Sequence, residues 1–304
     1  MDLINPALDV VFKMLLLRDE RLLRSMIEAV LGLTEPLAAV EVLNPEIPQH
    51  FHGDHGVVLD VRVRLGSGEE VDLEMATRGD GTLPSRLLFY WARHFSSQLP
   101  RGAEYKKLVP LRLILWTVRS VLPDVGRFHE RFRVVGEHSS ELFAPHLEIH
   151  VLDLTQLDRV SRGDDPRLRR WGRFFVLADD RDATLLAQED PIMSLAVKHL
   201  QHLSSDPVAR RIADDRERDL LAHGHVVASA RDEGIALGKE AGLALGKEEG
   251  LALGEGRTLL LAIETVAELL GIELTAARRR ELEAASLAEL RERLAQLRQR
   301  RAWV

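Results

Sequence analysis

Two acidic residues, Asp60 and Glu74, lie in neighbouring segments in which apolar and polar residues alternate. The segments are VVLDVRVRLG and VDLEMAT, and the Ser67-Gly68 pair between them is typical of a hairpin turn. Because side chains alternate between the two faces of a strand, Asp60 and Glu74 can converge on one face of this hairpin. Two carboxylates are the oxygen ligands that Mg²⁺ or Mn²⁺ prefers, and such an ion can activate water for attack on a phosphodiester.

The same spacing has a second interpretation, in which the polar residues carry out no chemistry. Asp72 and Ala76 share the predicted face of Glu74, whereas Leu73 and Met75 share the opposite face. Antiparallel strands commonly have one face against the core and the other in water. Spacing alone therefore leaves open whether these acids form a metal site or line a solvated face.

The flanking segments predict the elements that would hold this hairpin. Asn5 and Pro6 predict the start of an N-terminal helix, and Asp19 and Gly32 predict the start and end of a second one. Further strands are predicted in AAVEVLNPEIP, LVPLRLILWTV, RFRVV and LEIHVLDL, and a helix is predicted in LPSRLLFYWARHFSSQL. This order indicates a mixed α/β domain with one central sheet.

From about Asp165 onward the apolar periodicity is that of helices. Three helices are predicted, in DPRLRRWGRFFVLA, PIMSLAVKHLQHL and DPVARRIADDRERDLLAHGHVVASARDEG. An eight-residue repeat then places glycine at every fourth position from Gly234 to Gly254. Each glycine in a helix interior costs about 1 kcal/mol relative to alanine. The segment is therefore either a flexible linker or a helix whose glycine stripe packs closely on another helix.

These changes of pattern predict four parts of the chain. Residues 1–160 form the core, residues 161–232 form a helical extension, and residues 233–256 carry the glycine repeat. Residues 257–304 form a helical hairpin that Gly271 interrupts, with Thr275 and Ser286 as helix caps. This last part is the candidate for self-association into a homo-oligomer.

Composition narrows the class of protein. The 304 residues include no cysteine, which excludes disulfides and thiolate metal sites. No segment reads as a signal peptide or as an apolar run of about 18 residues, so we expect a cytoplasmic protein without membrane contact. A net charge of -7 argues against a surface adapted throughout to nucleic acid, but it permits a local basic groove.

Other groups have both a chemical and a plain structural interpretation. His50, His52, Asp54 and His55 form either a transition-metal site or a solvated loop. The run LRRWGRFF either meets phosphates or forms a solvated helix face above a buried Trp171, and we expect His129, Arg131 and Arg133 at the surface.

LDVRVRLGSGEEVDLEMAT followed by SRLLFYWARHFSSQL resembles the PD-(D/E)XK nuclease family transposases, the recombination-promoting nuclease (Rpn) group. The opening ALDVVFKMLL is similar to the family's Asp-x-x-Phe-Lys start, LRLILW and LEIHVLDL resemble its later core strands, and the glycine-repeat tail is typical of relatives. The resemblance covers most of the chain. It implies an α/β, restriction-endonuclease-like core, with a central mixed sheet flanked by helices and an α-helical C-terminal region.

The resemblance also implies roles for individual residues. Asp60 matches the family's first metal-binding acid and Glu74 the second, and the backbone carbonyl of Met75 would be a further metal ligand. Asp9 matches a helix-borne acid near the same site. Ala76 occupies the last position of the D…(D/E)-x-K pattern, where a glutamine or lysine positions or activates the attacking water.

A methyl group at position 76 cannot orient water or stabilise charge. The chain is therefore an inactive relative, carries an experimenter's substitution, or fills the role from Lys13, Arg78 or Arg86. Losing one such group while keeping both metal ligands should lower the rate roughly 10²–10⁴-fold.

The function that follows is a Mg²⁺- or Mn²⁺-dependent DNA endonuclease, transposase-like and recombination-promoting. Ala76 weakens or abolishes its activity unless Lys13, Arg78 or Arg86 fills the missing role. It would bind DNA through local lysine and arginine residues near the cleft. The alternative is a catalytically dead nuclease scaffold that acts as a DNA-binding or oligomeric interaction protein.

Overall fold

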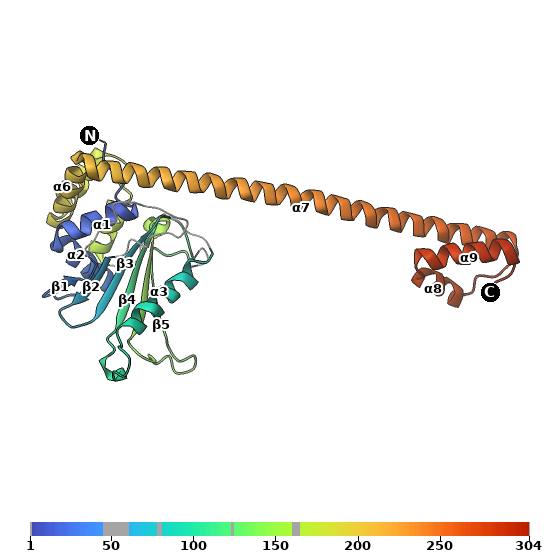
Figure 1. Ribbon diagram of the computed structural model, residues 1–304, viewed down its shortest axis with the longest axis horizontal. Coiled ribbons are helices and arrows are strands. Elements are labelled where there is room, and N and C mark those ends of the chain that lie inside the picture. Colours follow the sequence, from blue (N-terminus) through green and yellow to red (C-terminus); the bar gives the residue numbers. More distant parts are fainter. Residues whose placement is uncertain (1, 45–60, 78–80, 123–124, 160–164, 304) are drawn as a thin grey trace. The chain divides into compact units, whose positions relative to one another are not determined.

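A six-stranded sheet organises the N-terminal part of the chain in the computed structural model, which describes residues 2–44, 61–77, 81–122, 125–159 and 165–303 (Figure 1). The strands are β1 (Val40–Val42), β2 (Val61–Leu65), β3 (Glu70–Ala76), β4 (Leu111–Thr117), β5 (His129–Arg133) and β6 (Leu147–Asp153). Their order is β1-β2-β3-β4-β6-β5, with β3, β4 and β6 parallel and the other pairings antiparallel. The expected mixed central sheet is confirmed.

The β2–β3 hairpin has the predicted turn. Val61 pairs with Leu73 and Val63 with Val71 in an antiparallel register. The Gly68 amide donates a hydrogen bond of 2.8 Å to the carbonyl of Leu65, and Gly68 has a φ of +89°. That backbone conformation favours glycine, which explains why the turn is placed here.

The two faces of the hairpin have different environments. Val61 and Val63 of β2, with Leu73 and Met75 of β3, are buried in the main core against the N-terminal helices. The opposite face lies under helix α3 (Leu83–Ser97), and Ala76 packs there in a separate apolar cluster. The expected alternation between faces is confirmed.

The N-terminal helices are α1 (Asp9–Arg18) and α2 (Glu20–Leu31). Asp19 caps α2 by accepting the amide of Arg21, and Gly32 ends it at a φ of +64°, as predicted. The prediction that Asn5 caps α1 is wrong, because the Asn5 side chain accepts the amide of Ala7 at 2.9 Å and closes a turn before the helix begins.

Three shorter helices follow the sheet in the chain. They are α4 (Pro166–Phe175), α5 (Asp180–Glu189) and α6 (Pro191–Ser205), and two 3₁₀ turns span Tyr105–Lys107 and Leu154–Arg159. α4 buries Trp171 completely, as expected. The sequence did not predict α5, because this charged segment buries only Ala183 and Leu186.

The chain divides into two compact units, residues 1–223 and 224–304. Helix α7 (Pro207–Leu269) is continuous through the glycine repeat, so the linker interpretation is wrong. Beyond the helix's own backbone and the neighbouring residues, no described atom lies within 4 Å of where a Cβ would stand on Gly234, Gly242 or Gly250. The described residues therefore do not supply the close packing of the other interpretation. The predicted four-part division stays a prediction.

The C-terminal unit has its own small core. The end of α7 packs with α8 (Ala276–Ala284) and α9 (Leu287–Arg300). Its buried residues are Ile263, Leu282, Leu290, Leu294 and Leu297. Thr275 and Ser286 cap the two short helices as predicted, and Ser286 forms a capping box with Glu289. Among the described residues, no helix is long and apolar enough to cross a membrane.

A buried ion pair ties α1 to the start of α7. Asp9 and Arg216 are 5% and 8% exposed. Arg216 Nε donates to both carboxylate oxygens of Asp9, at 2.9 and 3.1 Å, and its Nη2 also contacts the carboxylate. The amide of Val10 donates a further hydrogen bond of 2.9 Å to Asp9. The acid is therefore fully engaged by these contacts.

We expect Arg216→Ala to lower the free energy of unfolding by about 3 kcal/mol, because it leaves the Asp9 carboxylate buried without its partner. Chemical denaturation measures this value. Arg218→Ala is the matched control on the same helix, since Arg218 pairs with Asp215 at the surface and its loss should cost less than about 0.5 kcal/mol. Equal costs for the two variants would contradict a structural role for the buried pair.

Candidate active site

A cleft of about 430 Å³ lies between α3 and the sheet. Arg62, Asp72 and Glu74 line it from the strands. Tyr90, Arg93 and His94 line it from α3, where positions three and four apart share one face. Of the predicted acids that the structure describes, only Glu74 lines this cleft.

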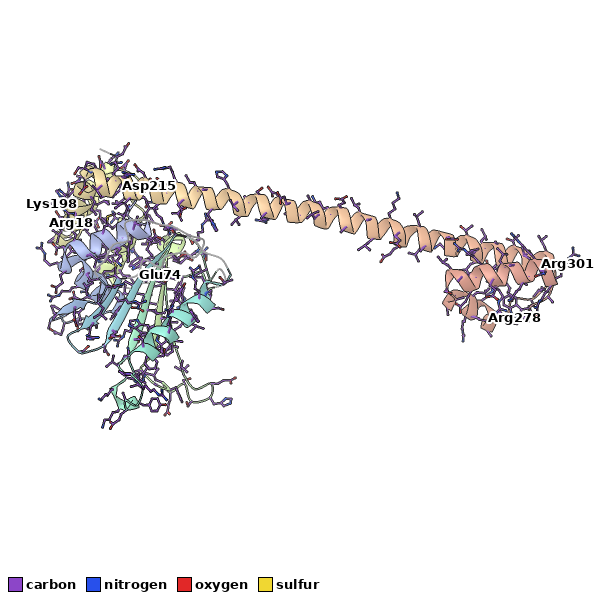
Figure 2. The ribbon with its side chains drawn as sticks, viewed as in Figure 1. Arg18, Glu74, Lys198, Asp215, Arg278 and Arg301 are labelled. Atoms are coloured by element: carbon purple, nitrogen blue, oxygen red, sulfur yellow. The ribbon has the colours of Figure 1, made fainter. Side chains whose placement is uncertain are left out.

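Glu74 is half-buried near the end of β3, opposite Leu115 of β4 (Figure 2). Its strand is hydrogen-bonded on both sides, which fixes the backbone that carries this carboxylate. Asp60, its expected partner, lies outside the described residues. So do Arg78 and the cluster of His50, His52, Asp54 and His55.

The residues after Glu74 face opposite sides of the sheet. Met75 is buried in the main core and pairs in register with Trp116. Ala76 is 5% exposed and packs with Leu83 and Leu87 of α3 in an apolar cluster. The environment of position 76 therefore suits a methyl group, and a longer polar side chain would have to pass this cluster to reach the cleft.

The proposed substitutes for the missing group at position 76 are in different places. Lys13 is buried on α1, which packs on the opposite face of the sheet from Ala76. Arg86 is half-buried on α3, next to Leu87, which packs against Ala76. Its Nε atom is buried and has no hydrogen-bond partner among the described residues. Arg86 therefore lies on the same side of the sheet as Ala76, whereas Lys13 does not.

Asp9 is not among the described residues that line the cleft. It lies on α1, on the face of the sheet opposite to α3, and Arg216 engages its carboxylate. The structure therefore does not place Asp9 beside Glu74 in this cleft, and the role that the resemblance implies for Asp9 stays a prediction.

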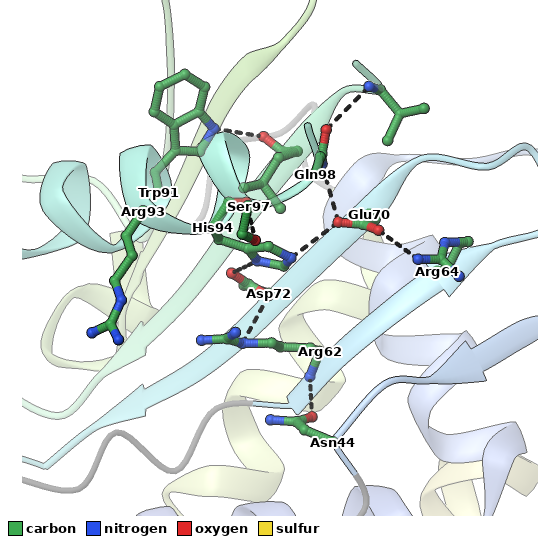
Figure 3. A network of polar contacts seen from close by, with 12 residues as sticks. Asn44, Arg62, Arg64, Glu70, Asp72, Trp91, Arg93, His94, Ser97 and Gln98 are labelled. Carbon is green, nitrogen blue, oxygen red and sulfur yellow. Dashed lines mark hydrogen bonds and ion pairs between the residues drawn. The ribbon is translucent and has the colours of Figure 1, made fainter. Parts of the chain in front are cut away.

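A buried polar network joins β3 to α3 (Figure 3), and two of its members, Asp72 and His94, line the same cleft as Glu74. His94 Nδ1 is 2.7 Å from Asp72 Oδ2, and His94 Nε2 is 3.0 Å from Glu70 Oε2. All three residues are less than 10% exposed. Arg64 and Gln98 donate hydrogen bonds of 2.9 and 3.0 Å to Glu70. Both ring nitrogens of His94 thus face a carboxylate.

The charge of His94 follows from these contacts. Burial acts to lower the pKa of His94, but the hydrogen bond to Asp72 and the charges of Asp72 and Glu70 outweigh it, so the pKa is raised above its usual 6.5. A protonated imidazole can donate from both nitrogens at once. The helical spacing of LPSRLLFYWARHFSSQL predicts only that His94 lies on a helix face. The acids at positions 70 and 72, which alternate along the strand, are the sequence signal for its partners.

A second histidine pair lies on the other face of the sheet. His129 Nε2 is 2.9 Å from His150 Nδ1, and His150 Nε2 is 3.0 Å from Glu148. His129 was expected at the surface, but it is half-buried. Burial and the neighbouring charges of His150 and Arg131 lower the pKa of His129 to about 4.

The described residues do not by themselves form a metal site. Among them, no group of three or more histidine, aspartate or glutamate side chains could hold a metal ion. Glu74 offers a carboxylate in the cleft, while Asp72 is engaged by His94 and lies 3.8 Å from Arg62 Nε. A hard divalent cation fits a site in which Glu74 is joined by a second carboxylate from outside the described residues.

Comparison with known families gives one match. The sequence model of the PD-(D/E)XK nuclease family transposases matches residues 6–230. This range includes the whole sheet, α3 and the start of α7. No curated protein and no solved structure gives a significant match. Nucleases of the PD-(D/E)XK class generally use divalent metal ions.

The two histidines should affect stability in opposite pH ranges. The raised pKa of His94 means that its contribution is complete below pH 6.5 and is lost as the pH rises through the folded-state value. We therefore expect the free energy of unfolding to fall as the pH rises above 6.5, and His94→Gln to reduce that fall. Chemical denaturation across this range measures it.

His129→Gln is the matched control for this experiment. Because the pKa of His129 is lowered to about 4, its neutral form is favoured by folding, and its contribution is lost as the pH falls from 6.5 toward 4. The control should change the acid side of the profile and leave the alkaline side unchanged. An alkaline slope that is the same in the parent and in His94→Gln would show that His94 is not protonated in the folded state.

Proposed function

Because the chain belongs to the PD-(D/E)XK nuclease family transposases, we propose that it is a metal-dependent, recombination-promoting DNA endonuclease that hydrolyses phosphodiester bonds. The observation that supports this proposal is the half-buried carboxylate of Glu74, which lines the cleft under α3. By the resemblance, Glu74 is the family's second metal-binding acid. β3 is paired on both sides beneath this carboxylate, and α3 brings Arg93 to the same cleft.

Asp60 and Glu74 would hold the ion, together with the backbone carbonyl of Met75. In support, Asp60 directly precedes Val61, and Val61 pairs with Leu73, the residue before Glu74. When bound, Mg²⁺ or Mn²⁺ lowers the pKa of a water molecule and stabilises negative charge on the phosphate. Asp9, held by Arg216, would support the site through the position of α1.

The chain's own residues would then position the substrate. β3 fixes Glu74 through hydrogen bonds to both of its neighbours, and α3 covers the polar face of the strand. The buried His94 network holds α3 to β3 beside the cleft. Of Lys13 and Arg86, Arg86 is on the same side of the sheet as Ala76 and would orient water in its place.

One observation favours the alternative, a catalytically dead nuclease scaffold that binds DNA or a protein partner. The methyl group of Ala76 is packed against Leu83, Leu87 and Leu113, as in an ordinary core position. A site that kept both metal ligands but packed this position with apolar groups would bind a metal ion and DNA without efficient cleavage.

Cleavage of supercoiled plasmid with Mg²⁺ or Mn²⁺ tests the proposal. We expect Ala76→Gln to raise the nicking rate by about 10²-fold or more, because the amide can position water. Ala76→Leu is the control of similar size, since either substitution should overpack the cluster at a cost of about 1–3 kcal/mol. Only the glutamine variant should gain activity.

Glu74→Gln, made in the Ala76→Gln protein, should abolish that gain, because it removes the carboxylate proposed to hold the ion. If no variant cleaves the plasmid, yet all of them bind DNA with the same salt dependence, the protein is a binder and the catalytic assignment fails.

We also infer that the C-terminal region brings copies of the chain together. Helix α7 leaves Ile235, Leu243 and Leu251 exposed, and its glycines have open space beside them. Exposed apolar residues along a helix of 63 residues are poorly suited to a helix surrounded by water.

Size-exclusion chromatography with light scattering tests the association. The full chain should have a mass of two or more copies, and a chain that ends at Asp232 should have the mass of one copy. An oligomer that survives this truncation unchanged would exclude the region after Asp232 as the associating element.

A further inference from the structure

We propose that Arg93 of α3 is a phosphate-binding residue that holds a backbone phosphate of DNA in the cleft beside Glu74. This inference rests on the proposed nuclease function and assigns the cation that would bring the substrate to that site. Arg62 and Arg93 are the described arginines that line the cleft, and Arg62 lies 3.8 Å from Asp72.

Arg93 lies on the wall of the cleft opposite Glu74. α3 turns Tyr90, Arg93 and His94 toward the cleft, and the strands supply Arg62 and Glu74 from below. The side chains of Arg62 and Arg93 extend toward the same end of the polar network, one from the strand and one from the helix (Figure 3). A phosphate that approached Glu74 would therefore pass within reach of the Arg93 side chain.

The guanidinium of Arg93 has no partner among the described residues. Its side chain is exposed, and its guanidinium forms no hydrogen bond or ion pair with any described residue. Neighbouring arginines of the sheet differ in this respect. Arg64 donates to Glu70 at 2.9 Å, and Arg112 donates to Glu69. Of these three arginines, Arg93 is the one whose donors are available to a ligand.

The cleft also needs such a cation if it is to accept DNA. Asp72 and Glu74 place two carboxylates in it, and the chain as a whole has a net charge of -7, so long-range attraction of a polyanion is weak. His94 cannot supply the charge, because carboxylates face both of its ring nitrogens. A guanidinium offers paired donors that match the oxygens of a phosphate.

A second group of arginines shows why number alone does not define a phosphate site. Arg21, Arg24, Arg167 and Arg170 surround a cavity of about 310 Å³ next to α2 and α4. Each of them pairs with an acid, respectively Asp19, Glu20, Asp165 and Asp190. Because an acid neutralises the charge of each arginine, we do not expect this cavity to bind an anion strongly.

Fluorescence anisotropy of a labelled DNA duplex, titrated at several salt concentrations in metal-free buffer with EDTA, measures binding without cleavage. Arg93→Ala should weaken binding by roughly tenfold. It should also reduce the slope of log affinity against log salt concentration by about one, the change expected for one lost phosphate contact. Arg93→Lys should keep the slope and lose part of the affinity, because it keeps the charge but not the paired donors.

Arg169→Ala is the matched control. Arg169 is also exposed on a helix and without a partner among the described residues, but α4 packs on the other face of the sheet. Its loss should leave affinity and slope unchanged. If Arg93→Ala binds DNA as tightly as the parent and with the same slope, the proposed role of Arg93 is overturned, while the proposed function is not. An equal effect of Arg169→Ala also overturns it, since it would reflect overall charge.

A parent that does not bind DNA at any salt concentration defeats the proposed function, and the role of Arg93 fails with it. Thermal unfolding of each variant checks that the fold is intact. Arg93 is exposed and makes no contact through its guanidinium, so its replacement should change the free energy of unfolding by no more than an exposed substitution does.

Discussion

The pleat of β3 is the constraint on which the rest of this structure depends. Odd-numbered residues of this strand, such as Leu73 and Met75, are buried in the main core, and even-numbered residues face α3. A slip of the β2–β3 register by one residue would exchange these two sets. It would place Glu74 in the core and Met75 in the cleft. The turn at Gly68 and the hydrogen bonds to β4 together prevent this slip.

The even-numbered residues of β3 form a graded series under α3. Glu70 and Asp72 are buried and share His94 as a partner, because a buried carboxylate needs one. Glu74 is half-buried at the cleft, and Ala76 packs in an apolar cluster. The same strand therefore passes from a polar network that stabilises the fold, through an acid at the cleft, to an apolar contact. Only the middle position has both the exposure and the charge that chemistry requires.

Local signals allowed much of this architecture to be predicted from the sequence. The hairpin at Ser67-Gly68, the cap at Asp19 and the end at Gly32 depend on residues a few positions apart, and all three are confirmed. Features that depend on distant residues were not predicted. Asp9 and Arg216 are separated by 207 positions, and no local pattern indicates that they pair. His94 could be placed on a helix face, but its carboxylate partners depend on how α3 crosses the sheet.

Helix α7 forms despite the low helix propensity of its glycines. Glycine at every fourth position made a linker as reasonable as a helix, yet the helix is continuous. A step of four residues advances about 40° beyond one turn of an α-helix, so the glycines wind around α7 rather than follow one side. The exposed leucines of the repeat wind in the same way. A partner that covers these leucines would have to surround α7 or wind around it. Two straight helices packed side by side would cover only part of them.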